Sequence, residues 1–401
     1  MMQFNRIFSI LVVLLLFIGC EQDVPLSPQT QTSAELGGAV ITEGGGGRAA
    51  VKTMTYNIYV GANVDRILEA TDLIDLSQKV AAAYDTLFLT NFEERAQSIA
   101  KLIKRDKPHL IGLQEISLIQ RFDPATFGLI EQQNYFQILM DALVSEGLNY
   151  QFADSIQNFD VLLPRFLDFI PPSTLVFDLV RLLDADVILV RDDVQYSNVI
   201  KGNYSVALPV PVPTTPPDTL DIFRGYVSIN ANVGQKSYRF INTHLESFVE
   251  LIRLAQAQEL TTIFSGETLP IIMVGDFNTG DPMPPNPYND VTYQFLTMIA
   301  GYEDTWVYNL KGNQDEGFTS PFSAALQDPY PNLYQRLDLI FAKNFEGPIG
   351  PVQAEVIGIR FKDRTPSGLW PSDHAGVVAK LHLREMNNMT NSVITFAETP
   401  E

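Results

Sequence analysis

Short apolar runs that end in polar residues recur along most of this 401-residue chain, and they limit the folds open to it. Several of these runs follow one another without an intervening helix, whereas a single doubly wound sheet would require a helix between successive strands. The pattern therefore predicts an α/β protein in which two sheets pack as a sandwich. The expected strands span residues 51–58, 109–114, 187–190, 225–229, 238–242, 269–274, 337–341 and 377–381.

Two stretches have helical spacing instead. In residues 92–105 the apolar side chains, among them Phe92, Ala96, Ile99 and Ile103, recur every three or four positions, with charged residues on the opposite side. Residues 248–264 carry a similar pattern between two expected strands. The sequence therefore predicts one helix in each stretch.

Residues 120–220 are the least regular part and are expected to form an insertion. The stretch 160–183 is strongly apolar, but prolines such as Pro164 and several charged residues interrupt it, so it cannot be one long helix or a membrane span. Residues 206–219 contain five prolines and predict an extended loop. We expect the insertion to pack on the surface of its own domain. The alternative is an apolar lip that covers a substrate site or touches lipid.

The first nineteen residues are expected to be a signal peptide. Arg6 provides a positive start, and residues 7–18 are apolar apart from Ser9, a run too short to span a bilayer. The run ends at Phe17-Ile18-Gly19-Cys20, which resembles the lipobox of bacterial lipoproteins, although Phe17 stands where leucine is usual. The resemblance implies a lipid anchor on Cys20 in the bacterial cell envelope, facing the periplasm or the exterior. An ordinary cleaved signal with an incidental cysteine is the alternative.

The remaining chain divides into three expected parts. Residues 20–50 contain many Pro, Ser, Thr and Gln residues and a four-glycine run at 44–47, which predicts a flexible tether. Residues 51–385 form the folded domain, and residues 386–401 form a C-terminal tail. We expect the protein to be a monomer.

Charge and cysteine content exclude several classes of function. The chain has 47 acidic and 27 basic residues, a net charge of -20, and no basic stretch that could clamp nucleic acid tightly. An acidic enzyme can still cut nucleic acid, because contact at a metal centre needs few basic residues. Cys20 is the single cysteine, which excludes a disulfide, a zinc–cysteine site and a cysteine nucleophile within the domain. No Gly-x-Ser-x-Gly elbow surrounds any serine.

Polar residues gather where the expected strands begin or end. Of the four histidines, His244 follows an apolar strand and His374 precedes one, whereas His109 and His382 lie in structural settings. A titratable ring at the end of a strand can face a cleft. Carboxylates and amides occur in the same way in Gln114-Glu115, Gly275-Asp276-Phe277-Asn278 and Arg336-Leu337-Asp338. These hard oxygen ligands suit Mg²⁺ or Mn²⁺, with Ca²⁺ as a further possibility.

The order of these motifs resembles that of the endonuclease/exonuclease/phosphatase superfamily. The resemblance covers residues 51 to about 383, and its most specific blocks are Gly275-Asp276-Phe277-Asn278 and Ser372-Asp373-His374. The other matching blocks are Tyr56-Asn57-Ile58, Leu113-Gln114-Glu115, Arg224-Gly225, Asn242-Thr243-His244-Leu245 and Arg336-Leu337-Asp338. The resemblance implies a four-layered α/β sandwich of two packed mixed sheets flanked by helices, with the active site at one edge between the sheets.

Site roles follow from the resemblance, position by position. Glu115 would be the principal metal ligand, Asn57 would contact metal or phosphate, and Asp373 would be a further ligand or hydrogen-bond acceptor. Asp276 and Asn278 would hold the nucleophilic water and the phosphate oxygens.

The two histidines and one arginine complete the expected site. His374, oriented by Asp338, would be the base that activates water or the cation that faces the phosphate. His244 would be an acid or a phosphate clamp, and Arg224 would contact a non-bridging phosphate oxygen.

These roles predict a divalent-metal-dependent hydrolase of phosphoester bonds. A phosphodiesterase acting on a phospholipid head group or a small phosphodiester is the leading expectation. The alternatives are a secreted or surface endonuclease, for which DNA or RNA is a substrate only, and a binding lipoprotein that keeps the fold without catalysis.

Overall fold

The computed structural model describes residues 50–170, 174–213, 218–279, 290–310, 316–345 and 352–382. The expected signal peptide, Cys20, nearly all of the tether and the tail at 386–401 lie outside the described residues. Among the helices of the described part, none is long and apolar enough to cross a membrane.

The first sheet has eight strands. They are β1 (Ala50–Asn57), β2 (Leu110–Gln114), β3 (Leu118–Phe122), β4 (Leu129–Asn134), β5 (Tyr150–Ile170), β6 (Thr174–Arg191), β15 (Gln353–Ile357) and β16 (Gly376–His382). Their order is β15-β16-β1-β2-β6-β3-β4, with β5 paired to the other edge of β6. The sheet is mixed, because β1 runs parallel to β2 and antiparallel to β16.

The second sheet has six strands in the order β13-β14-β12-β11-β10-β7. It is also mixed, since β11 runs parallel to β12 while β10 and β14 run antiparallel to their neighbours. Its strands are β7 (Gln195–Asn203), β10 (Gly225–Val233), β11 (Lys236–His244), β12 (Ile271–Asp276), β13 (Glu303–Asp304) and β14 (Asp338–Lys343).

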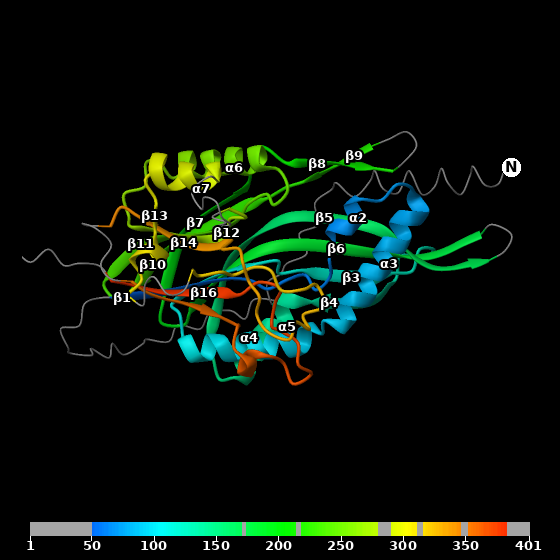
Figure 1. The fold of residues 1–401 in the computed structure, drawn as a ribbon, viewed down its shortest axis with the longest axis horizontal. Coiled ribbons are helices and arrows are strands. Elements are labelled where there is room, and N and C mark those ends of the chain that lie inside the picture. The colour runs from blue at the N-terminus through cyan, green and yellow to red at the C-terminus, as the bar shows by residue number, and fades with distance from the viewer. Residues whose placement is uncertain are drawn as a thin grey trace, which may run out of the picture.

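The two sheets pack face to face, and helices cover both outer faces (Figure 1). Leu110 and Ile188 of the first sheet share one buried cluster with Phe240 and Val274 of the second. The predicted four-layered sandwich is therefore confirmed. The first sheet is covered by α3 (Leu73–Leu89), α4 (Phe92–Asp106) and α5 (Tyr135–Ser145), and the second by α6 (Glu250–Ile263) and α7 (Val291–Gln294).

Every predicted strand and helix is observed, whereas the structure also contains elements that were not predicted, among them β3, β4, β5, β7, β13, β15, α3 and α5. Each of the eight expected strands falls on an observed strand, and both expected helices are present as α4 and α6. The apolar spacing of residues 92–105 places Ala96, Ile99 and Ile103 in the buried core, while Asn91 accepts a hydrogen bond from the Glu94 amide and caps the helix. The shorter helical elements are α2 (Asp65–Leu68), a π-helix at Phe295–Ile299 and 3₁₀ turns at Thr305–Tyr308 and Phe361–Asp363.

Much of residues 120–220 belongs to the two sheets of the domain, and the expectation that this stretch is an insertion stays a prediction. The strands β3 to β6 belong to the first sheet, and β6 pairs with β2, β3 and β5. The prediction that residues 160–183 are not one helix is confirmed, because residues 160–170 lie in β5 and residues 174–183 lie in β6, two long paired strands. Pro164 is tolerated there because, among the described strands, β5 pairs only with β6 and its other edge forms no ladder.

The expected loop at 206–219 is paired in its described part. β8 (Leu208–Val212) and β9 (Asp218–Ile222) form a two-stranded ribbon in which Val210 lies opposite Leu220. Pro209 and Pro211 occupy alternate positions, so their missing N–H groups fall on the same edge of β8 and the other edge can pair. The prediction of an extended backbone was correct, but the prediction of a loop was wrong.

Asn242 joins the two sheets near the edge that carries the polar motifs. Its Nδ2 donates to the carbonyl oxygens of Leu113 and Val187, at 3.0 Å each, and its Oδ1 accepts from Gln114 Nε2 at 2.6 Å. Asn242 is fully buried, so these bonds satisfy groups that water cannot reach. They hold the end of β2 against β11, and with it the residues that follow each strand.

Candidate active site

Strand direction explains why motifs far apart in sequence meet. The ends of β1, β2, β11 and β12 reach one edge of the sandwich, and the antiparallel β10, β14 and β16 begin at that edge. A polar cleft of about 250 Å³ lies there. Seven of the nine predicted site residues line it, namely Glu115, Arg224, His244, Asp276, Asn278, Asp373 and His374. Asn57 and Asp338 are buried and hydrogen-bonded to lining residues.

Asn57 connects the two sides of the cleft. Its Nδ2 donates to Glu115 Oε1 at 2.9 Å and to Asp276 Oδ2 at 3.1 Å, and its Oδ1 accepts from the Tyr59 amide. The Val60 amide donates to Glu115 Oε2 at 2.7 Å. Glu115 has a φ of 60°, an uncommon value for a residue other than glycine, and the surrounding hydrogen bonds hold it there. Asn57 therefore acts as a donor that orients two carboxylates.

Asp276 lies at the centre of the site. Its Oδ2 is 3.6 Å from His244 Nε2 and 3.8 Å from His374 Nδ1, and its Oδ1 accepts from the Asn278 amide. Burial raises the pKa of Asp276 to about 6, with the charge of Asp338 adding to the effect and that of His374 opposing it. Asp276 is therefore mostly ionised at neutral pH and can accept a proton.

His374 is held by a buried carboxylate. Asp338, which is 1% exposed, accepts from His374 Nδ1 at 2.8 Å. Burial alone would lower the pKa of His374, but the carboxylates of Asp338 and Asp276 together raise it well above its ordinary value. The raised pKa favours the imidazolium form of His374 in this arrangement. Of the two roles expected for His374, this charge favours the cation that faces the phosphate, and the role of a base that activates water stays a prediction.

His244 is a neutral ring. Burial, and then the positive charges of Arg224 and His374, hold the pKa of His244 well below its usual range. Arg224 Nη1 lies 3.2 Å from His244 Nδ1, and because a guanidinium only donates, this ring nitrogen must accept. Nε2 therefore carries the proton and faces Asp276. The ring can donate to a phosphate or leaving-group oxygen.

Two carboxylates beside this histidine were missed in the sequence. Asn158 Nδ2 donates to Asp184 Oδ2 at 2.9 Å and to Asp186 Oδ2 at 3.0 Å, and Asp186 Oδ1 lies 3.9 Å from His244 Nδ1. Burial raises the pKa of Asp184 to about 6 and that of Asp186 well above its usual value. Two acids spaced by two residues in an apolar strand share a face, and that spacing was the available signal.

Arg95 is the second omission. Its guanidinium is fully buried and donates to the carbonyl oxygens of Ile58, Tyr59, Thr90 and Pro371 at 2.7 to 3.1 Å. These contacts tie the loop after β1 to the segment that carries Asp373 and His374. Arg95 lies in a helix beside charged residues in the sequence, and this pattern does not predict that its side chain is buried.

Two groups of side chains could hold a divalent cation. Asp276, Asp338 and His374 bring ligand atoms within 4.8 Å of one another. However, His374 Nδ1 already donates to Asp338, which competes with binding through that nitrogen. Glu115 and Asp373 also line the cleft, and burial together with the like charge of Glu115 raises the pKa of Asp373 to about 7. Crowded carboxylate oxygens of this kind fit a hard cation.

Comparisons with known proteins concern the family and the fold. The profile described as "Endonuclease/Exonuclease/phosphatase family" matches residues 54–374. No protein of curated function matches the sequence. Among solved structures, an endonuclease/exonuclease/phosphatase family protein from Bacteroides thetaiotaomicron is 16% identical with a TM-score of 0.50, covering 84% of this chain and 100% of that one.

Two further solved structures are similar at slightly lower scores. A mannosyl-6-phosphatase from Bacteroides thetaiotaomicron is 17% identical, covers 82% of this chain and 99% of that one, and has a TM-score of 0.48. TDP2 from D. rerio, complexed with a single-strand DNA product, is 16% identical, covers 83% and 99%, and also has a TM-score of 0.48. At these identities the similarity concerns the fold.

Proposed function

The chain belongs to the endonuclease/exonuclease/phosphatase family, and from that premise we propose that it is a divalent-metal-dependent phosphodiesterase acting on a phospholipid head group or a small phosphodiester. The observation that carries the proposal is the cleft in which Glu115, Asp276 and two histidines converge from both sheets. Phosphoester hydrolysis needs a positioned water, a proton acceptor and positive charge on the phosphate oxygens. Each requirement has a candidate in the cleft.

The cation would be held by Glu115 and Asp373, and when bound it would supply positive charge to the phosphate oxygens. Mg²⁺ or Mn²⁺ suits these ligands best, with Ca²⁺ a further option. Arg224 and the His374 imidazolium add positive charge from the protein itself.

The water would be held by Asp276 and Asn278. Asp276 accepts its proton, because this carboxylate is largely ionised at neutral pH. The Nε2–H of neutral His244 donates a hydrogen bond to the leaving oxygen. Asn57 maintains the positions of Glu115 and Asp276 by bonding to both.

The test is hydrolysis of bis-p-nitrophenyl phosphate by the purified protein with Mg²⁺, with and without EDTA. We expect release of nitrophenol that EDTA abolishes, and we expect Glu115→Gln and His374→Ala to lose it while keeping the wild-type melting temperature. Asp123→Asn, which changes a half-buried loop acid outside the cleft, serves as the control. Near-full activity in either variant would refute the assignment of that residue.

A parallel substrate panel addresses the alternatives. Sphingomyelin and phosphatidylinositol vesicles test for hydrolysis of a phospholipid, and plasmid DNA tests for nuclease activity. Binding of Mg²⁺ or Mn²⁺ without hydrolysis of any phosphoester would favour a non-catalytic binding lipoprotein.

We also propose that a lipid on Cys20 anchors a monomeric enzyme in the bacterial cell envelope, facing the periplasm or the exterior. The support is the apolar run of residues 7–18 that ends at the single cysteine. Membrane fractionation should recover the wild type with the membrane and Cys20→Ser in the soluble fraction. Recovery of both forms in the soluble fraction would argue for an ordinary cleaved signal.

A further inference from the structure

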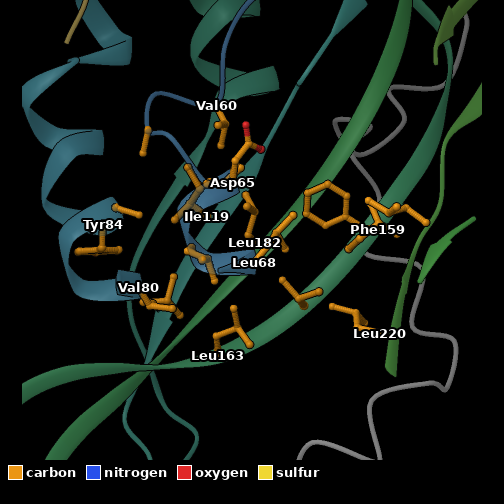
Figure 2. Close-up of a pocket in the computed structure, with 18 of the residues that line it drawn as sticks. Val60, Asp65, Leu68, Val80, Tyr84, Ile119, Phe159, Leu163, Leu182 and Leu220 are labelled. Atoms are coloured by element: carbon orange, nitrogen blue, oxygen red, sulfur yellow. The ribbon is translucent and has the colours of Figure 1, made fainter. Parts of the chain in front are cut away.

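An apolar cavity of about 140 Å³ lies beside the polar cleft. Figure 2 shows its walls, with Val80 and Tyr84 on one side, Phe159 and Leu220 on the other, and Leu182 between them. Nearly all the side chains that line it are aliphatic or aromatic.

Regular secondary structure builds these walls. Phe159, Val161 and Leu163 alternate along β5 and therefore share one face of the strand. On the opposite wall, Val80 and Tyr84 lie one helical turn apart on α3. The three β5 side chains remain only partly buried, so the chain does not fill the space between its own walls.

The cavity adjoins the cleft, because the two share six lining residues. Arg224 and Asp65 stand at the junction, and the apolar side chains beside them face both spaces. A molecule whose phosphate contacts Arg224 would therefore bring its neighbouring atoms to the mouth of the cavity. The residues that line both are Val60, Val64, Asp65, Phe159, Leu182 and Arg224.

We propose that this cavity is a binding subsite for an alkyl or acyl chain attached to the phosphoester that the cleft hydrolyses. The proposal rests on the proposed function and names the substrate class as a single-chain amphiphilic phosphoester. A protein cavity of about 150 Å³ lined by similar side chains stays dry and binds benzene, so this one should hold a segment of roughly six carbons. Each methylene that enters should raise kcat/KM by roughly three- to four-fold at most.

A chain-length series measures this directly. The substrates are methyl, hexyl and dodecyl p-nitrophenyl phosphate, each kept below its micelle concentration. In each case a water oxygen bonds to phosphorus, p-nitrophenolate leaves with the electrons of the broken P–O bond, and the water's protons go to the protein and solvent. We expect kcat/KM to rise steeply from methyl to hexyl and to level off at dodecyl.

Three variants assign the effect to the cavity. Leu163→Glu on β5 and Leu220→Glu on β9 place a charge on two separate walls and should reduce the dodecyl-to-methyl ratio of kcat/KM at least ten-fold. Leu162→Glu is the matched control, because the side chain of Leu162 points to the other face of β5 and does not line the cavity. Its ratio should remain that of the wild type. Because the two test substitutions lie on different strands, the result does not depend on the correct folding of a single variant.

The outcomes separate this inference from the proposed function. Equal kcat/KM for all three esters would overturn the proposed subsite without affecting the proposed phosphodiesterase function. If size-exclusion chromatography then also showed a dimer, the cavity would be assigned to contact with a second copy of the chain. If no ester is hydrolysed, the proposed function fails, and binding decides the subsite. Dodecyl phosphate should then displace the neutral fluorophore N-phenyl-1-naphthylamine from the wild type and from Leu162→Glu, but not from Leu163→Glu. No displacement from the wild type would refute the subsite.

Discussion

Replacing Asp338 with asparagine should remove most of the activity while leaving the fold intact. The side chain is 1% exposed, and its Oδ2 accepts from His374 Nδ1 at 2.8 Å. Asparagine has nearly the same shape, and its oxygen can still accept this hydrogen bond. The change therefore deletes one negative charge beside the imidazolium and little else.

The size of the effect follows from the geometry. Two opposite charges about 4 Å apart near a protein surface attract by about 4 kcal/mol, and a hydrogen bond involving charged groups contributes about 1.5–3 kcal/mol against about 1 kcal/mol for a neutral one. With part of the bond retained, the loss should be about 3 kcal/mol, or roughly 100-fold in kcat/KM. The pKa of His374 falls when the carboxylate is removed, so the alkaline limb of the pH–rate profile should move to lower pH.

The assay is kcat/KM for a p-nitrophenyl phosphodiester across the pH range, with the melting temperature measured in parallel. Asp178→Asn is a matched control, because Asp178 is also a buried acid, paired with Arg165 and Arg121, but does not line the cleft. It should lower stability without changing kcat/KM of the folded enzyme. Activity of Asp338→Asn within three-fold of the wild type would refute the reasoning. An acid limb that moves instead would return His374 to the role of base.

Three further predictions concern stability and use urea denaturation. Arg95→Met should lose about 3–5 kcal/mol, because it leaves four buried carbonyl oxygens without their donor; a loss below 1 kcal/mol would contradict this account. Gly275→Ala should lose more than about 3 kcal/mol, since its Cβ would lie 1.9 Å from the Thr243 carbonyl oxygen, whereas Gly266→Ala, which meets nothing within 4 Å, should change little. Burial and then the charge of Arg191 lower the pKa of His109 to about 4. Between about pH 6.5 and pH 4 the unfolded chain binds a proton that the folded chain excludes, so the free energy of unfolding falls as pH falls. His109→Asn should reduce that fall by about 1–2 kcal/mol, after allowance for the partial exposure of the ring. An unchanged pH dependence of stability would refute this prediction.

Local patterns in the sequence were sufficient for the sandwich and most of its strands. An apolar strand such as 271–276 is recognisable because its burial on both faces requires a continuous apolar run, and α4 because a half-buried helix requires a period near 3.6. The polar motifs of the candidate site were also visible, because each occupies a few consecutive residues at the end of a strand. Their order along the chain carries the family resemblance, and that resemblance implied one active site for Asn57, Glu115, His244 and Asp276, which the structure brings together at the cleft.

Tertiary structure alone decided the features that depend on distant partners. The inward turn of Arg95 depends on carbonyl groups from Ile58 to Pro371, and no local pattern encodes those contacts. The charge state of His374 depends on how far burial is outweighed by two carboxylates from different strands. The apolar cavity exists because β5, β9 and α3 enclose a space that their own side chains do not fill. Packing and electrostatic interactions depend on which residues are neighbours in space, and local sequence patterns do not specify those neighbours.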